Sequence, residues 1–155
     1  MSHESYAVLI SDFLSTAGID QSPPIPEEPG PLDFKIGEYT CTVFPLEEEE
    51  KVVIQSEVMP LDSLDSDQAT SAVKLLHRLN WGARCVNGIM AMIDADGTVV
   101  VSKTLETALI DGDCLGETMA EVLEAAENLT SILKAGPSSA PEGEQSDWIN
   151  LSRIV

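Results

Sequence analysis

The order in which the hydrophobic period changes along the chain constrains its fold more than any other feature. Apolar residues recur at helical spacing in residues 4–17, 67–81 and 113–134. The stretches with strand-like alternation or β-branched composition are residues 32–36, 39–44, 51–58, 89–93 and 98–104. Because the strands are grouped rather than alternating with helices, the sequence predicts an α+β fold in the order α-β-β-β-α-β-β-α. We expect a twisted, mostly antiparallel sheet packed by the helices.

The tetrapeptide Asp94-Ala95-Asp96-Gly97 separates the last two strands. An Asp-Gly pair between apolar runs is typical of a hairpin turn, which is the structure we expect here. The alternative is a calcium-binding loop of the EF-hand type, which needs Gly at its sixth position and Glu at its twelfth. In this chain Gly97 is fourth and Leu105 is twelfth, so the spacing does not fit.

Two segments depart from the periodic pattern. Residues 21–31 contain five prolines, which predicts an extended stretch or a linker. Residues 137–147 are mostly Pro, Ser, Gly and Glu, and an apolar octapeptide, Trp148–Val155, follows them. The sequence therefore predicts one domain over residues 1–136 and a flexible C-terminal tail over residues 137–155.

Several broad classes of protein are made improbable by the composition. Eight basic residues face 27 acidic ones, for a net charge of −19, whereas a nucleic-acid-binding surface needs a basic face. The longest apolar runs are about five residues and a membrane-spanning helix needs about 20, so we expect no membrane insertion. The first residues lack a basic stretch followed by an apolar one, which argues against a secretory signal.

The charge is unevenly distributed. Residues 1–66 have a net charge of −12, residues 67–110 a net charge of 0, and residues 111–155 a net charge of −7. The neutral block also holds more apolar residues than one helical stripe requires, namely Leu75, Leu79, Trp81, Met90 and Met92. Because two copies of the chain repel each other least through this block, it is the expected interface of a homodimer.

No residue pattern indicates catalysis. The three cysteines form no CxxC pair, and His77 has no carboxylate at helical spacing. The acidic run Glu47–Glu50 lies between two strands, where a solvated loop is more usual than a metal site. We therefore expect no catalytic residue, no metal and no cofactor; an enzyme with an unrecognised site, such as a hydrolase, is the alternative.

The part of the chain from the second helix to the last resembles a known family. The residues that carry the resemblance are Leu75-Leu76-His77-Arg78-Leu79-Asn80, the segment from Gly88 to Val101 with its Asp-x-x-Gly hairpin, Thr104-Leu105-Glu106, Asp111 and Leu115. Together with the small size, the acidity and the N-terminal helix, they are similar to the class I type III secretion chaperones, the Tir-chaperone family. The similarity covers roughly residues 4–134.

The resemblance implies a homodimer without catalytic activity in the bacterial cytoplasm. Such a protein holds the N-terminal region of a secreted effector in extended form and keeps it secretion-competent, and the ATPase of the secretion apparatus is a further expected partner. In the family, apolar patches on the sheet and first helix bind the effector, and the middle helix with the next strand builds the dimer. The alternative function is a small acidic protein-binding adaptor, or a general holdase not tied to secretion.

These expectations assign two sets of residues. The effector-binding residues, which follow the apolar pattern of the first helix and the first three strands, are expected to be Tyr6, Ile10, Phe13, Phe34, Tyr39, Val43, Val52 and Ile54. The dimer interface is expected to comprise Ala72, Leu75, Leu76, Leu79, Trp81, Met90 and Met92.

Overall fold

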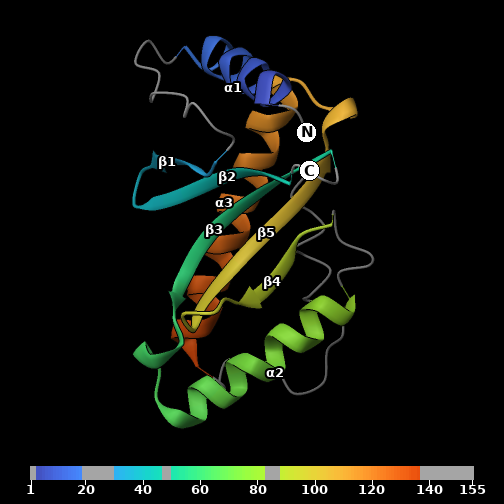
Figure 1. Cartoon of the computed structure of the whole chain (residues 1–155). Coiled ribbons are helices and arrows are strands. Elements are labelled where there is room, and N and C mark those ends of the chain that lie inside the picture. Colours follow the sequence, from blue (N-terminus) through green and yellow to red (C-terminus); the bar gives the residue numbers. More distant parts are fainter. Residues whose placement is uncertain (1–2, 19–29, 47–49, 83–87, 137–155) are drawn as a thin grey trace. The chain divides into compact units, whose positions relative to one another are not determined.

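The computed structural model describes most of the chain (Figure 1). The described residues are 3–18, 30–46, 50–82 and 88–136. By its internal contacts the chain divides into two compact units, of which unit 1 comprises residues 1–56 and 102–123, and unit 2 comprises residues 57–101 and 124–155. The Pro-rich stretch before residue 30 and the predicted tail from residue 137 lie outside the described residues.

The helices and strands that the sequence predicts are all present in the predicted order, which confirms the α+β class. They are α1 (His3–Thr16), β1 (Leu32–Ile36), β2 (Tyr39–Leu46), β3 (Lys51–Pro60), α2 (Ser66–Gly82), β4 (Met90–Ile93), β5 (Thr98–Glu106) and α3 (Gly112–Ala135). Two short 3-10 turns, η2 (Leu61–Ser63) and η4 (Thr107–Leu109), follow β3 and β5.

The strands form one five-stranded sheet in the order β1-β2-β3-β5-β4, so β1 and β4 are its edges. β1 pairs antiparallel with β2, with Leu32 opposite Val43, and β2 pairs antiparallel with β3, with Val43 opposite Ile54. Tight connections join two of the neighbouring pairs, since a two-residue turn links β1 to β2 and residues 94–97 link β4 to β5.

β2 is longer than the sequence predicts, because it continues through Pro45 to Leu46. Proline has no N–H to give to a neighbouring strand, which is why we expected it to end this one. In the structure Pro45 pairs with Val52 of β3, but β1 reaches only as far as Leu32, opposite Val43. On its other side Pro45 therefore has no β1 partner, and its missing N–H costs no bond there.

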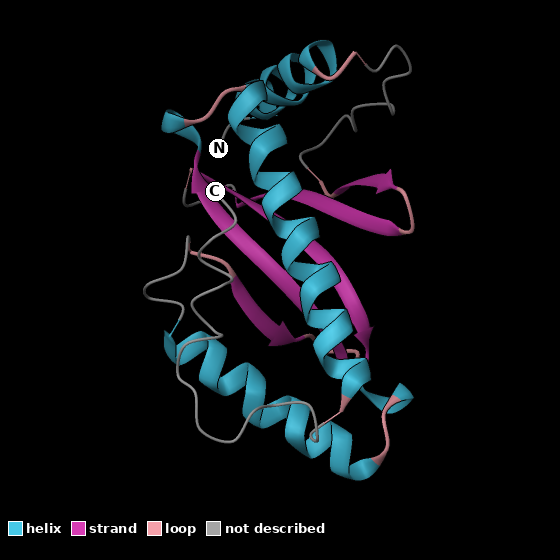
Figure 2. Cartoon of the chain, turned by 180° about the vertical axis from the view of Figure 1, so that it is seen from behind, coloured by secondary structure: helices cyan, strands magenta, loops and turns pink. Residues whose placement is uncertain are grey.

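In unit 1, α1 and the first half of α3 pack with β1, β2 and the adjoining parts of β3 and β5 (Figure 2). The Phe13 and Phe34 rings meet edge to face, with centroids 5.4 Å apart. Asp12 of α1 accepts a hydrogen bond from the backbone N–H of Gly112 at 2.7 Å, which ties the two helices together. The largest side chains of this unit that have almost no exposed surface are Tyr6, Ile10, Ile54, Leu115, Met119, Val43, Val52, Val122 and Cys41.

Unit 2 combines α2, the β4–β5 hairpin and the second half of α3. Its buried apolar residues are Ala72, Leu76, Ala91, Val99, Val100, Val101, Ala126, Leu129 and Leu133. Helix α2 begins with a capping box in which Asp65 accepts a bond from the N–H of Gln68 at 2.8 Å and the Gln68 side chain accepts one from the N–H of Asp65. The cap is therefore Asp65, immediately before the first helical residue Ser66.

The expected hairpin turn is confirmed at residues 94–97. The Asp94 carboxylate accepts hydrogen bonds from the backbone N–H groups of Asp96 and Thr98, at 2.9 and 2.8 Å, as in an Asx turn. Gly97 has a φ of +80°, a conformation that favours glycine. The carboxylate that a calcium loop would use as a ligand is thus engaged by the turn's own backbone.

Candidate partner-binding surfaces

Seven of the eight predicted effector-binding residues lie in the core of unit 1. Only Tyr39 is partly exposed. The buried ones are Tyr6, Ile10, Phe13, Phe34, Val43, Val52 and Ile54, each less than a tenth exposed. These seven side chains do not form an open apolar surface, because α1 and α3 supply further apolar side chains to the same core. The seven buried residues therefore hold α1 and the strands of unit 1 in place, and they are not part of its exposed surface.

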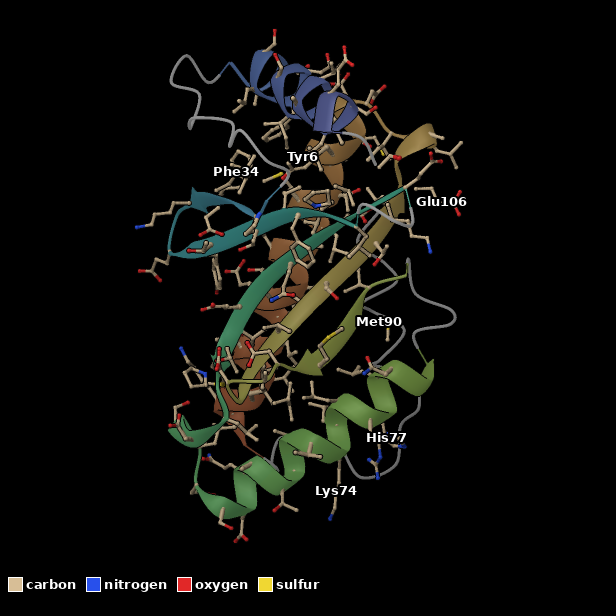
Figure 3. The ribbon with its side chains drawn as sticks, viewed as in Figure 1. Tyr6, Phe34, Lys74, His77, Met90 and Glu106 are labelled. Carbon is tan, nitrogen blue, oxygen red and sulfur yellow. The ribbon has the colours of Figure 1, made fainter. Side chains whose placement is uncertain are left out.

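Tyr6 illustrates why. Its hydroxyl donates a hydrogen bond to the carbonyl oxygen of Val43 at 2.9 Å and lies 3.2 Å from that of Gly30. Burial raises the pKa of Tyr6 to about 12, because the phenolate would be desolvated. Figure 3 shows Tyr6 and Phe34 beneath α1. The phenol thus anchors α1 to β2 by its polar end as well as its ring.

The cysteines show no reactive arrangement in the described part of the chain. Cys41 is fully buried, and burial raises the pKa of its thiol to about 12, so the thiolate needed for nucleophilic chemistry does not form near neutral pH. Cys114 is half-buried and is not in a disulfide. Cys85 lies outside the described residues.

Unit 1 does expose apolar side chains, at positions that the sequence prediction did not include. Val8 on α1 and Ile36 at the end of β1 are exposed, and Leu109 in η4 is 77% exposed. Tyr39 and Phe44 of β2 are half-buried. Val8 does not belong to the apolar face that helical spacing predicts for residues 4–17, which is the one sign in the sequence that it faces outward.

The predicted dimer residues divide into a supporting layer and a surface. Ala72 and Leu76 are buried, whereas Leu75 and Leu79 are half-buried. On β4, Met90 is 48% and Met92 is 38% exposed. The side chain of Trp81 lies outside the described residues. Two further exposed apolar residues, Val73 and Ile93, belong to the same helix and strand but were not among the predicted interface residues.

A side-chain contact that the sequence did not indicate joins α2 to β4. The Asn80 carboxamide donates a hydrogen bond to the carbonyl oxygen of Ala91 at 2.5 Å and accepts one from the N–H of Ala91 at 2.9 Å. Ala91 itself is buried. The two bonds fix the middle of β4 to the last turns of α2.

The outer side of α2 has a basic character that contrasts with the acidic chain. Lys74, His77 and Arg78 are all exposed. Figure 3 shows Lys74 and His77 projecting from α2 away from β4, and Met90 on β4 itself. Lys74 and His77 therefore point away from the exposed methionine of β4.

Neither a metal centre nor a membrane span is evident where the structure gives positions. Residues 3–18, 30–46, 50–82 and 88–136 contain no group of three or more His, Cys, Asp or Glu placed to hold a metal ion. Glu47–Glu49 of the acidic run lie outside these ranges. No helix among the described residues has the length and hydropathy to cross a bilayer.

Comparison with solved structures gives three closely similar folds. A chain of the ExsC–ExsE complex matches with a TM-score of 0.72 and 18% identity, covering 89% of this chain and 98% of that one. A chain of the HopA1–SchA chaperone–effector complex gives 0.70 and 17%, with coverage of 84% and 97%. A chain from the complex of the Yersinia pestis type III secretion chaperone SycH with a fragment of YscM2 gives 0.62 and 17%, with coverage of 80% and 98%. A comparison with curated proteins finds no match.

These likenesses show that the chain shares the fold of these three proteins. The model of the Tir chaperone protein (CesT) family matches residues 8–130, which is most of the chain. The chain belongs to the Tir chaperone protein (CesT) family, and the resemblance that the sequence alone indicated is confirmed.

Proposed function

We propose that this protein binds the N-terminal region of a type III secreted effector in extended form and keeps it secretion-competent. The observation that carries the proposal is the family match over residues 8–130, which spans all the described helices and strands except the first few residues of α1 and the last of α3. The chaperone role is that of a binding protein rather than an enzyme, and needs neither metal nor cofactor. Its place would be the bacterial cytoplasm, with the secretion-apparatus ATPase as a further partner.

The working form is proposed to be a homodimer assembled through unit 2. The exposed apolar residues of this unit are Val73, Met90, Met92 and Ile93. They lie in the block of residues 67–110, whose net charge is zero in a chain of net charge −19. Burying them against a second copy removes apolar area from water where electrostatic repulsion between two acidic chains is least.

The effector is proposed to bind unit 1. Two of its exposed apolar residues, Val8 and Ile36, together with half-buried Tyr39, are the proposed contacts in place of the seven core residues. The core residues still matter, because Tyr6 and Phe34 hold α1 and β1 in place. An extended segment pays an ordering cost on binding, so we expect a long interface of many apolar contacts rather than one pocket.

Hydrogen exchange on the complex with a co-encoded effector fragment tests the proposal. We expect protection over the fragment's N-terminal region and over α1, β1 and β2. Protection confined to a folded part of the partner, with the N-terminal region exchanging freely, would contradict it and favour an adaptor. The variants Val8→Asp and Ile36→Asp should each weaken binding, whereas Lys74→Ala on unit 2 is the control that leaves it unchanged.

The salt dependence of this binding provides a second test. Raising the salt concentration from about 0.1 to 1 M shortens the Debye length to about 3 Å. Because the expected contacts are apolar, the Kd should change by less than about threefold. A loss of binding at 1 M salt would indicate that charge rather than apolar burial holds the effector.

A further inference from the structure

Strand β4 is an edge of the sheet, and one of its outer backbone positions is already occupied. Both bonds between Asn80 and Ala91 involve the backbone of the strand and the side chain of the helix. A carboxamide presents a donor and an acceptor side by side, as the backbone of a neighbouring strand does. Asn80 therefore takes the place of one residue of a further strand.

The direction of the other backbone groups supports this reading. In a strand, the N–H and C=O of one residue point to the same edge, and successive residues alternate between edges. Across the hairpin, the N–H of Asp94 donates to the carbonyl of Thr98 at 2.9 Å, so the backbone of Asp94 faces β5. By alternation Met92 also faces β5, whereas Ala91 and Ile93 face outward.

The side chains of β4 follow a second alternation, between the two faces of the sheet. Ala91 points to one face and is buried, and Met90 and Met92 point to the other and are exposed. The strand thus combines an edge that is closed at its centre with a face that is apolar and open.

We propose that a second copy of this chain packs against the exposed face of β4 but does not pair with its edge, because Asn80 already bonds the outward backbone groups of Ala91. The inference rests on the homodimer of the proposed function. With Asn80 in place, Met90 and Met92 can pack against a partner while the sheet is not extended. An uncapped edge, in contrast, could add strand after strand, since an exposed row of N–H and C=O groups is a template for pairing. A closed pair is the assembly that the cap permits.

The second copy is the occupant that the charges favour. Residues 1–66 and 111–155 have net charges of −12 and −7, so two copies repel through those parts of the chain. Residues 67–110, which hold Asn80 and β4, have a net charge of 0. The face of β4 is also apolar, and methionine side chains adapt readily to a partner surface.

The test compares the full chain with Asn80→Ala, Asn80→Asp and the control His77→Ala, an exposed position one turn earlier on α2. Exchange of the Ala91 amide is measured by NMR, and particle size by light scattering from about 1 to 100 μM. We expect at least tenfold faster exchange of this amide in Asn80→Ala, and slow exchange in Asn80→Asp, which keeps an acceptor for the N–H. Asn80→Ala should also form particles larger than those of the unchanged chain, and His77→Ala should not.

A second substitution guards against misfolding as the cause of any large particles. Ile93→Lys, placed on the same exposed edge, should prevent the large particles that Asn80→Ala forms, because an edge lysine opposes strand pairing. Unchanged Ala91 exchange in Asn80→Ala, an unchanged particle size, or large particles that Ile93→Lys does not reduce would each overturn the proposal. If the unchanged chain is a monomer, the homodimer fails, while the exchange rate and the size difference still decide whether Asn80 closes the edge.

Discussion

The backbone of α1 passes so close to Gly112 that no side chain fits there. A Cβ atom at this position would lie 2.5 Å from the Phe13 nitrogen and 2.6 Å from the Asp12 carbonyl carbon. Gly116, one turn later in α3, would place its Cβ 3.4 Å from the Phe13 ring, which is an ordinary contact. The two glycines thus form a matched pair in one helix.

We expect Gly112→Ala to lower the free energy of unfolding by about 1–3 kcal/mol, because backbone atoms must move apart. Gly116→Ala should leave it unchanged or raise it by up to about 1 kcal/mol, since alanine favours a helix interior over glycine. Urea unfolding of the two variants measures the difference. Equal effects would mean that α1 does not approach α3 at Gly112.

Because of Tyr6, the free energy of unfolding should fall as the pH rises through the alkaline range. Burial raises the pKa of its phenol from 10.0 to about 12 in the folded chain. Between these values the unfolded chain releases a proton that the folded chain retains, so folding loses stability as the pH rises. The contribution is complete below about pH 10 and is lost as the pH approaches 12, at about 1.4 kcal/mol per pH unit.

The variant Tyr6→Phe isolates this effect. Near neutral pH it should be less stable by about 1 kcal/mol, because the bond to Val43 is lost. Between pH 9 and 12 the unchanged chain should lose about 2–3 kcal/mol more than the variant does. Denaturant unfolding at a series of pH values checks this. Parallel pH profiles for the two chains would show that the phenol is not buried as described.

At the scale of elements, the β4–β5 turn depends on one carboxylate. Asp94 accepts bonds from two backbone N–H groups, whereas Asp96 is exposed at the tip of the same turn. We expect Asp94→Ala to lower the free energy of unfolding by about 1 kcal/mol or more, and Asp96→Ala, which removes the same charge, to change it by less than about 0.5 kcal/mol. Urea unfolding measures both; similar losses would indicate a general charge effect.

The elements were predictable because the period of apolar residues is a local property. The positions of helices and strands depend on neighbours within a few residues, and most strand boundaries differ from the prediction by no more than two residues. At Pro45 the prediction failed because the length of β1, which decides whether an N–H is needed, is set by pairing with a distant segment.

The candidate sites were less predictable, since they depend on which face another element covers. The alternation of Cys41 and Val43 looks the same whether that face is open or buried. What buries Val43 includes α1, whose Tyr6 lies 37 residues away in sequence. The hydrogen bonds between Asn80 and Ala91 could not be predicted either, because the sequence of a helix does not indicate which strand its side chains will contact. The exposure of Met90 and Met92 agrees with their selection from the sequence, which rested on the charge neutrality of their block.

At the scale of the whole molecule, charge limits how two copies can meet. Each copy has a net charge of −19, and the apolar residues exposed on β4 lie in the neutral block. Unit 1 also exposes a large apolar residue, Leu109, which is 77% exposed. Although it belongs to the neutral block, it is not among the predicted interface residues, which are all on α2 and β4. A substitution of Leu109 by aspartate is therefore a control for the same substitution at Met90 and Met92 on β4.

We expect the double variant Met90→Asp/Met92→Asp to dissociate the homodimer, raising its Kd at least about 100-fold, equivalent to about 2.7 kcal/mol. Four carboxylates per dimer would then have to leave water between two chains that already repel each other. Leu109→Asp should leave the Kd unchanged, because its carboxylate stays in solvent. Light scattering across micromolar concentrations measures all three chains. A monomeric parent chain, or a double variant that still dimerises, would show that the face of β4 is not the interface.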